Sequence, residues 1–137
     1  MCNYSFYRFS TLNTKLGNKI DKYDLSYLGV EDNVVKTGET FGERDVYCKL
    51  ISVTNIPNNA AIRIDTELSG LYHYWIDPSY SFAFNQGGSR YPIPYVDVRD
   101  PSNSLSCAFY TESQITLASS TDWSEYSGFI CIKFTYD

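Results

Sequence analysis

The chain has 137 residues, 17% of them aromatic, with 13 tyrosines and a formal net charge of −5. That length suits a single domain that buries a core without disulfides or metals. The acidic balance and the lack of any Lys/Arg cluster argue against nucleic-acid binding through phosphate contacts. No apolar run reaches the roughly 18–20 residues of a membrane helix, so membrane insertion is not expected either.

The N-terminal residues predict no signal peptide, because Met1–Phe9 lack a basic start followed by an apolar run. We therefore expect folding in a cytosol. The four cysteines, Cys2, Cys48, Cys107 and Cys131, show no short paired spacing. In a reducing compartment they are expected to serve as small apolar residues with free thiols. Two disulfides in an oxidising compartment are the alternative.

The first part of the chain is expected to differ from the rest. Residues 3–9 predict a strand, whereas residues 10–40 are interrupted by Gly, Asn and Asp and predict irregular structure. Residues 1–33 are accordingly predicted to form a strand and an extended arm that could dock to a partner. Residues 34–137 are predicted to form a β-sandwich.

Period-two alternation of apolar residues after Phe41 predicts a series of short strands separated by turns rich in Gly, Pro, Asn and Asp. No segment predicts a helix, and the regular spacing is typical of an all-β sandwich or barrel. The expected turns are Asn55–Asn59, Asp77–Pro78, Asn85–Ser89 and Asp100–Asn103. The expected strands are Arg44–Asn55, Ala61–Asp65, Leu71–Ile76, Ser79–Phe84, Val96–Val98, Leu105–Tyr110, Gln114–Ala118 and Phe129–Asp137.

Two segments have a specific expected placement. In Tyr91–Tyr95, two prolines cannot donate backbone hydrogen bonds, so this segment is expected at a sheet edge or in an extended, polyproline-like form. The last strand alternates between two faces. The predicted core face holds Ile130, Ile132, Phe134 and Tyr136, and the other, mixed face, suited to solvent or a neighbouring subunit, holds Phe129, Cys131, Lys133 and Thr135.

Few residues suggest chemistry. The single histidine, His73, could pair with a cysteine or bind a metal, but a strand histidine is the favoured interpretation. Asp122 and Glu125 could form a glycosidase-like carboxylate pair, yet their spacing is better explained by a capping box on one helical turn. Trp123 could stack on a sugar, although an anchor that covers the end of the sandwich is favoured. We therefore expect no catalytic, cofactor-binding or metal-binding residues and no enzyme.

Four short motifs follow one another along residues 34–137: Val35–Phe41 with Val46–Lys49, Ile56–Asn58, Gly88–Val96 and Asp122–Thr135. In the same order they resemble motifs of the C-terminal tip domains of bacteriophage tail-fibre and head-fibre proteins. Those motifs are V-x-T-G-x-x-F with P-V-Y-x-K, a P-N turn, G-x-x-Y-x-L-P-Y-V, and D-W-S-x-Y-x-G running into the last strand.

This resemblance implies a jelly-roll-like antiparallel β-sandwich that assembles as a homotrimer, attaches to other virion proteins and binds a host surface receptor, either a glycan or a protein. It also implies location in the virion, after assembly in the cytoplasm of the bacterial host. The alternatives are a purely structural capsid decoration or tail adaptor protein, and a carbohydrate-binding module or small enzyme outside virions. Which residues bind a receptor is unknown from the sequence. The loops Asn85–Ser89 and Asp100–Asn103 are candidates, because loops on rigid scaffolds often carry recognition.

Overall fold

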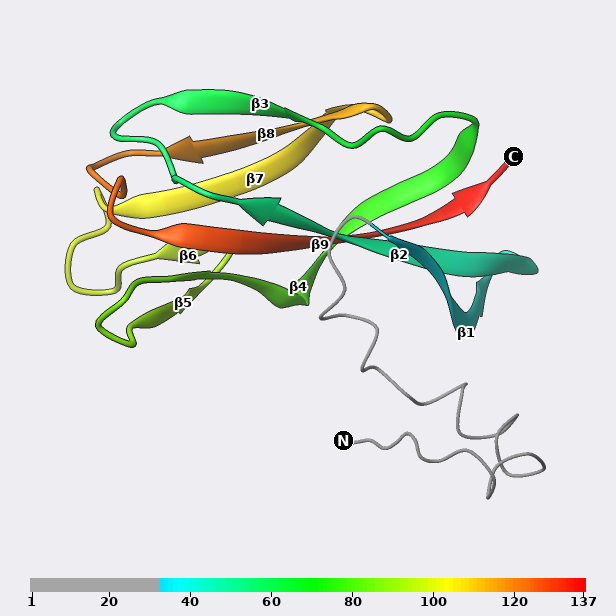
Figure 1. The fold of residues 1–137 in the computed structure, drawn as a ribbon, viewed down its shortest axis with the longest axis horizontal. Coiled ribbons are helices and arrows are strands. Elements are labelled where there is room, and N and C mark those ends of the chain that lie inside the picture. Colours follow the sequence, from blue (N-terminus) through cyan, green and yellow to red (C-terminus); the bar gives the residue numbers. More distant parts are fainter. Residues whose placement is uncertain (1–32) are drawn as a thin grey trace, which may run out of the picture.

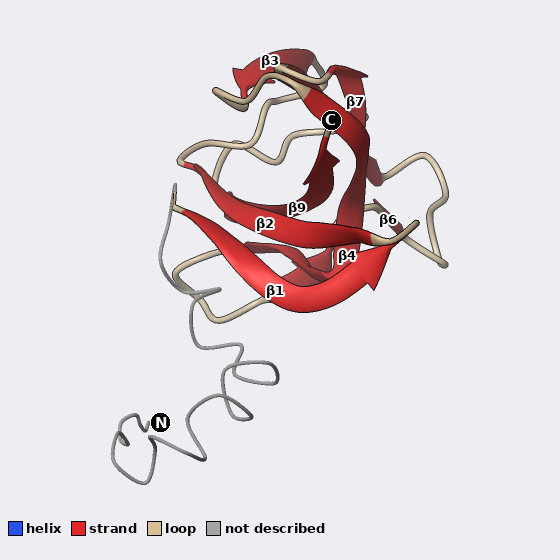
Figure 2. Cartoon of the chain, turned by 90° about the vertical axis from the view of Figure 1, so that its right-hand side faces the viewer, coloured by secondary structure: helices blue, strands red, loops and turns tan. Residues whose placement is uncertain are grey.

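A computed structural model of the protein describes residues 33–137. These residues form two antiparallel sheets packed as a sandwich, without a helix among them, which confirms the predicted all-β fold (Figures 1 and 2). The five-stranded sheet has the order β1 (Val34–Phe41), β2 (Arg44–Val53), β9 (Ser127–Tyr136), β4 (Leu71–Phe84) and β5 (Arg90–Pro92). The four-stranded sheet has the order β3 (Ala61–Asp65), β8 (Gln114–Ser119), β7 (Ser104–Thr111) and β6 (Tyr95–Val96).

Early strands pair with late ones: β2 lies against β9 in one sheet, and β3 lies against β8 in the other. This is how a ribbon of paired strands wraps into a jelly-roll-like sandwich. The predicted strand at residues 3–9 and the arm before residue 33 lie outside the described residues. Within residues 33–137, no helix has the length and apolar character that crossing a bilayer requires.

The last strand lies in the middle of its sheet, between β2 and β4. Its residues Ile130, Ile132 and Phe134 are fully buried between the two sheets, as predicted. The placement of Tyr136 in the core is wrong, since 38% of it is exposed. Tyr136 lies at the end of the strand, where its ring contacts those of Tyr47 at 5.0 Å and Phe134 at 5.5 Å without being enclosed.

The mixed face of β9 is also covered. The sequence suited this face to solvent or a neighbouring subunit, which is wrong for Cys131 and Thr135, because both are fully buried. Phe129 and Lys133 are half-buried. Cys131 belongs to a small second cluster on the outer side of the five-stranded sheet, together with Cys48 and Leu50. Tyr80 packs against this cluster. Alternation therefore identified the core face of β9, but it could not indicate that the outer face is also covered.

The expected separation of β4 into two strands is wrong. Residues 71–84 form one strand, and the register against β9 shifts between Asp77 and Phe82. Asp77 Oδ1 accepts a hydrogen bond from the backbone N–H of Ser79 at 2.9 Å, and the hydroxyl of Ser81 donates to Asp77 O at 2.8 Å. The residues that predicted a turn therefore form a bulge, in which extra residues leave the ladder of backbone hydrogen bonds without ending the strand.

Strand β1 was not expected from the apolar pattern, which placed residues 10–40 in irregular structure. It pairs with β2 and curves along that edge of the sheet (Figure 2). The buried hydroxyl of Thr37 donates to Val46 O at 3.0 Å, and Gly38 has a φ of 88°. The register shifts between Lys36 and Thr40, and this irregularity interrupts the period-two pattern that sequence analysis relies on.

The proline segment lies at sheet edges, as predicted. Pro92 ends β5, the edge strand of the five-stranded sheet, and Tyr95 begins β6, the edge strand of the four-stranded sheet. Between them Ile93 is fully buried in the core. An edge position leaves the ladder intact where proline has no N–H to donate.

Candidate functional site

Four loops meet at the end of the sandwich opposite the C-terminus, and we call this region the loop end (Figure 1). They are residues 54–60, 85–89, 97–103 and 120–126. Two of them are tied together by backbone hydrogen bonds, from Ile56 N to Tyr126 O at 2.9 Å and from Asn59 N to Thr121 O at 2.7 Å. The loop end is thus a connected surface on a rigid frame, a common place for binding sites.

The loop at residues 120–126 is held by an aspartate. Asp122 Oδ1 accepts hydrogen bonds from the backbone N–H of Ser124 at 2.9 Å and from its hydroxyl at 2.6 Å. These bonds lower the pKa of Asp122 below its usual range. The expected capping box on a helical turn is wrong, because Asp122 bonds two residues ahead in an Asx turn and leaves Glu125 exposed.

Trp123 is the anchor of the loop end. Only 4% of it is exposed, and its indole N–H donates to Asn103 Oδ1 at 2.9 Å. Its ring contacts those of Tyr91, Tyr95 and Tyr126, with centroids 5.4, 5.9 and 4.8 Å away. The anchor interpretation is therefore confirmed, and stacking of Trp123 on a sugar is wrong because the ring is buried.

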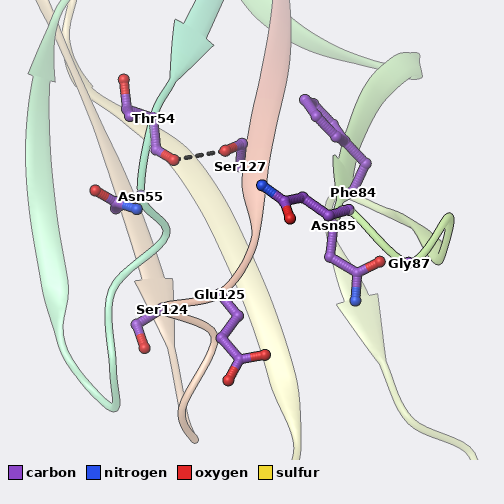
Figure 3. A pocket seen from close by; sticks show the side chains of 9 residues that line it. Thr54, Asn55, Phe84, Asn85, Gly87, Ser124, Glu125 and Ser127 are labelled. Carbon is purple, nitrogen blue, oxygen red and sulfur yellow. Dashed lines mark hydrogen bonds between the residues drawn. The ribbon is translucent and has the colours of Figure 1, made fainter.

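A hollow of about 560 Å³ opens at the loop end, and we call it the main hollow. Its volume lies within the range of roughly 300–1,000 Å³ that is usual for small-ligand sites. Three segments surround it: the end of β2 and its loop on one side, the β4–β5 loop opposite, and the start of β9 between them (Figure 3). The lining residues are Thr54, Asn55, Phe84, Asn85, Gln86, Gly87, Ser124, Glu125 and Ser127.

Some polar groups of the main hollow hold it together, whereas others are free. The hydroxyl of Ser127 donates to Thr54 O at 2.6 Å, which joins two of its sides (Figure 3). Among residues 33–137, the side chains of Asn55, Gln86 and Glu125 have no hydrogen-bond or ion-pair partner. These exposed amides and this carboxylate can bind a polar ligand without first breaking an internal bond.

One aromatic side chain, Phe84, completes the main hollow. Its ring stacks on Phe129 with centroids 5.6 Å apart, and the Arg90 guanidinium lies 5.1 Å from its centroid. Arg90 is itself bound to Ser89 O at 3.1 Å. These contacts fix the apolar part of the lining, so the site is partly organised before a ligand arrives.

A second, smaller hollow of about 140 Å³ lies beside the same β8–β9 loop. A backbone hydrogen bond from Arg99 lowers the pKa of Asp97, and burial raises the pKa of Tyr95 and of Tyr126. At neutral pH this hollow therefore presents carboxylates and neutral phenols. Its lining residues are Tyr91, Tyr95, Asp97, Asn103, Thr121, Asp122, Trp123 and Tyr126.

The residues considered for chemistry do not come together. Asp122 lines the second hollow and Glu125 the main one, so the two carboxylates do not share a site. His73 lies in β4, where its ring packs against Phe41 at 5.0 Å and Tyr72 at 4.5 Å, toward the opposite end of the sandwich. No group of three His, Cys, Asp or Glu side chains within the described part is placed to hold a metal ion.

Both candidate loops from the sequence lie at the loop end, although whether they bind a receptor stays a prediction. Asn85 lines the main hollow and Asn103 the second one. Sequence reasoning placed Gln86 in a candidate loop but did not connect it with Thr54 and Asn55, because these residues come from distant segments and share no motif. The one signal they offered was their position after a strand end, which many surface residues share.

Comparison with known proteins adds no relative. A scan against protein-family models found no match, and searches of curated proteins and of solved structures found none either.

Proposed function

We propose that this protein is a non-enzymatic bacteriophage virion protein, a fibre tip or head-fibre module that binds a host surface ligand through its loop end. The observation that carries the proposal is the main hollow, which is built from three segments on a rigid sandwich and includes polar side chains that have no partner among residues 33–137. The loop end faces away from the C-terminus (Figure 1). A binding surface at one end of a module suits a protein that presents that end to a host.

The motif residues support kinship with fibre tips because they build the frame of the sandwich. Thr37 and Gly38 make the irregularity in β1, and Trp123 closes the loop end. Gly128 fits where a side chain would be crowded, since an added Cβ would lie 3.2 Å from Phe82 O. Shared frame residues are what related sandwiches with different ligands retain, so the resemblance supports the type of protein and leaves its ligand open.

Homotrimer assembly is part of the proposal. Phe41, Tyr72 and Tyr110 are 50%, 51% and 59% exposed, at strand ends away from the loop end. Exposed aromatic side chains are enriched in interfaces because they bury large area at low entropic cost. Association through this end would leave the loop end free for a ligand.

The oligomeric state is measured first. Light scattering of the full chain at micromolar concentration should give three times the 15.7 kDa chain mass. Replacing Tyr72 and Tyr110 with serine should shift the protein toward monomer without loss of β structure by circular dichroism. A strictly monomeric wild-type chain would contradict the trimer.

Adsorption to cells separates the proposal from a purely structural virion role. Virions that carry Asn55→Ala with Gln86→Ala should assemble normally and adsorb poorly to their host. A capsid decoration or tail adaptor protein predicts normal adsorption for the same variant. Deleting residues 1–33 tests whether this segment attaches the protein to the virion. Loss of virion incorporation by a variant whose sandwich is still folded would identify residues 1–33 as the anchor.

A further inference from the structure

We propose that the loop end binds a saccharide without anionic groups, either neutral or bearing a protonated amine. This inference rests on the proposed function, since it names the class of ligand for the same site.

Hydrogen-bonding capacity is the first argument. Asn55 and Gln86 each offer amide donors and an acceptor, and Glu125 offers acceptors only. The Ser124 hydroxyl already donates to Asp122 Oδ1, so it can only accept from a ligand. Sugar hydroxyls donate and accept at once, so they can satisfy such a mixed set. Phe84 is the one aromatic residue of the lining, and its ring is already in contact with Phe129 and with the Arg90 guanidinium, so the polar groups carry this argument. A lining of this kind suits a saccharide better than an apolar peptide side chain, which would leave the polar groups unpaired.

Charge is the second argument. The four loops carry the acidic residues Asp97, Asp100, Asp122 and Glu125 against the single basic residue Arg99. Arg99 already lies 3.6 Å from an Asp97 carboxylate oxygen. No lysine or arginine of the described chain lines either hollow.

Beside the main hollow, the Arg90 guanidinium lies 5.1 Å from the Phe84 ring centroid. Even with Arg90 counted, an anionic polymer at the loop end would meet four acidic residues against two basic ones. Like charges at a binding surface select against such a ligand. By contrast, a protonated amine near Glu125 would gain a charge-assisted hydrogen bond.

The extent of the ligand follows from the shared loop. Ser124 and Glu125 line the main hollow, while Asp122 and Trp123 line the second one, so a single loop borders both. The main hollow, at about 560 Å³, is four times the volume of the second, at about 140 Å³. This arrangement assigns the principal sugar residue to the main hollow and a hydroxyl or substituent of a neighbouring residue to the second.

The test is a binding measurement on the full-length protein with an array of neutral, amine-bearing and anionic oligosaccharides, followed by titration calorimetry on the hits. Chitotetraose, its de-N-acetylated form and a polysialic acid oligomer represent the three classes. Hits are expected among the first two classes only. Asn55→Ala and Gln86→Ala should each weaken binding at least about tenfold, given a lost hydrogen bond in a ligand site.

Glu125 tests the role of charge. Glu125→Gln should weaken amine-bearing saccharides about tenfold and leave neutral ones within about twofold. The matched control is Glu43→Gln, which removes an exposed carboxylate from the β1–β2 turn at the other end of the sandwich and should change neither. Unchanged circular dichroism and unfolding midpoint establish that each variant is folded.

The outcomes distinguish failure of the saccharide inference from failure of the proposed function. Anionic oligosaccharides bound as tightly as neutral ones, or binding indifferent to Asn55 and Gln86, would overturn the saccharide inference. Adsorption to host cells that depends on these residues, without any saccharide hit, would overturn it too while leaving the proposed function standing. Saccharide binding by a chain that neither trimerises nor joins virions would uphold the site and overturn the fibre assignment.

Discussion

At the scale of single residues, close packing decides which side chains a position can hold. Gly128 is the clearest case, because an added Cβ would lie 3.2 Å from Phe82 O and 3.4 Å from Ile56 Cδ1. One of these neighbours is backbone in the same sheet, which cannot move without disturbing the ladder. The glycine of the closing motif is therefore required by packing, and its φ plays no part.

Gly128→Ala should lower the free energy of unfolding by about 1–3 kcal/mol, the usual cost of overpacking a core. Urea unfolding followed by fluorescence measures it. Gly87→Ala is the matched control: its added Cβ would have ordinary contacts, the nearest at 3.5 Å to Asn85 Oδ1. A loss of stability at Gly87 equal to that at Gly128 would argue against the packing explanation.

Asn103 also stabilises the loop end, through hydrogen bonds to its side chain. Its side-chain oxygen accepts from Trp123 Nε1 at 2.9 Å and from the Thr121 hydroxyl at 2.8 Å. Asn103→Ala leaves the buried indole N–H unpaired and should cost about 1–3 kcal/mol of unfolding free energy. Ser106→Ala, on an exposed position of β7, should stay within about 0.5 kcal/mol of wild type. An equal effect of both variants in urea would contradict the role given to the amide.

At the scale of elements, β9 is the strand on which the fold most depends. It pairs with β2 along one side and with β4 along the other, and its side chains are buried on both faces. Central strands lose no backbone hydrogen bond to solvent, so they form the most stable part of a sheet. The irregularity of β1 falls in its pairing with β2, at the edge of the sheet, and that of β4 falls in its pairing with β9.

Substitutions along β9 should therefore differ sharply in their effects. Ile132→Ala removes a fully buried side chain and should cost about 2–5 kcal/mol of unfolding free energy. Tyr136→Ala, at a position that is 38% exposed, should cost less, chiefly its ring contacts of about 0.5–1.5 kcal/mol with Tyr47 and Phe134. Chemical denaturation of the two variants side by side gives the comparison. A larger loss at Tyr136 would show that the end of the strand is covered in solution.

At the scale of the whole molecule, the two ends of the sandwich differ in character. The loop end is acidic and polar and carries the hollows, whereas the exposed aromatic residues lie toward the other end. Between the ends, the described thiols are packed among apolar side chains. Cys48, Cys107 and Cys131 form no disulfide within residues 33–137, as predicted for these three; Cys2 lies outside the described residues.

Thiol reactivity reports on the intact sandwich. Burial raises the pKa of Cys107 to about 12. A hydrogen bond with Cys48, together with burial, also raises the pKa of Cys131 above its ordinary value. Because the thiolate is the reactive form, iodoacetamide at pH 8 should label these thiols about a hundredfold or more slowly than in urea. A Cys2→Ser variant limits the readout to the three described thiols, and mass spectrometry counts the labels. Rapid labelling of Cys131 in the native protein would contradict its burial.

The fold could be predicted to a large extent because its main signals are local. Alternation of Ile130, Ile132 and Phe134 and the turn residues around Asn55–Asn59 depend on neighbours in the chain. The predictions of strand boundaries were wrong where pairing with a distant strand changes the local pattern. In the sequence, the bulge at Asp77 has the residues of a turn. The strand before Phe41 was not predicted because a register shift within it interrupts the period-two alternation.

The candidate site could be predicted only as two candidate binding loops, Asn85–Ser89 and Asp100–Asn103. Thr54, Gln86 and Glu125 are far apart in the sequence, and nothing in their local patterns indicates that they line one hollow. They meet because the sandwich brings the ends of β2, β4 and β8 to one side.

By itself, the sequence determined the architecture of this protein, since period-two alternation and turn chemistry are properties of neighbouring residues and are sufficient to specify strands and a two-sided core. Only the tertiary structure decided which tyrosines are exposed, that the outer face of β9 is covered as well as its core face, and which polar residues share a hollow. The physical reason is that burial and site geometry depend on contacts between distant segments, and such contacts exist only once the sheets have packed.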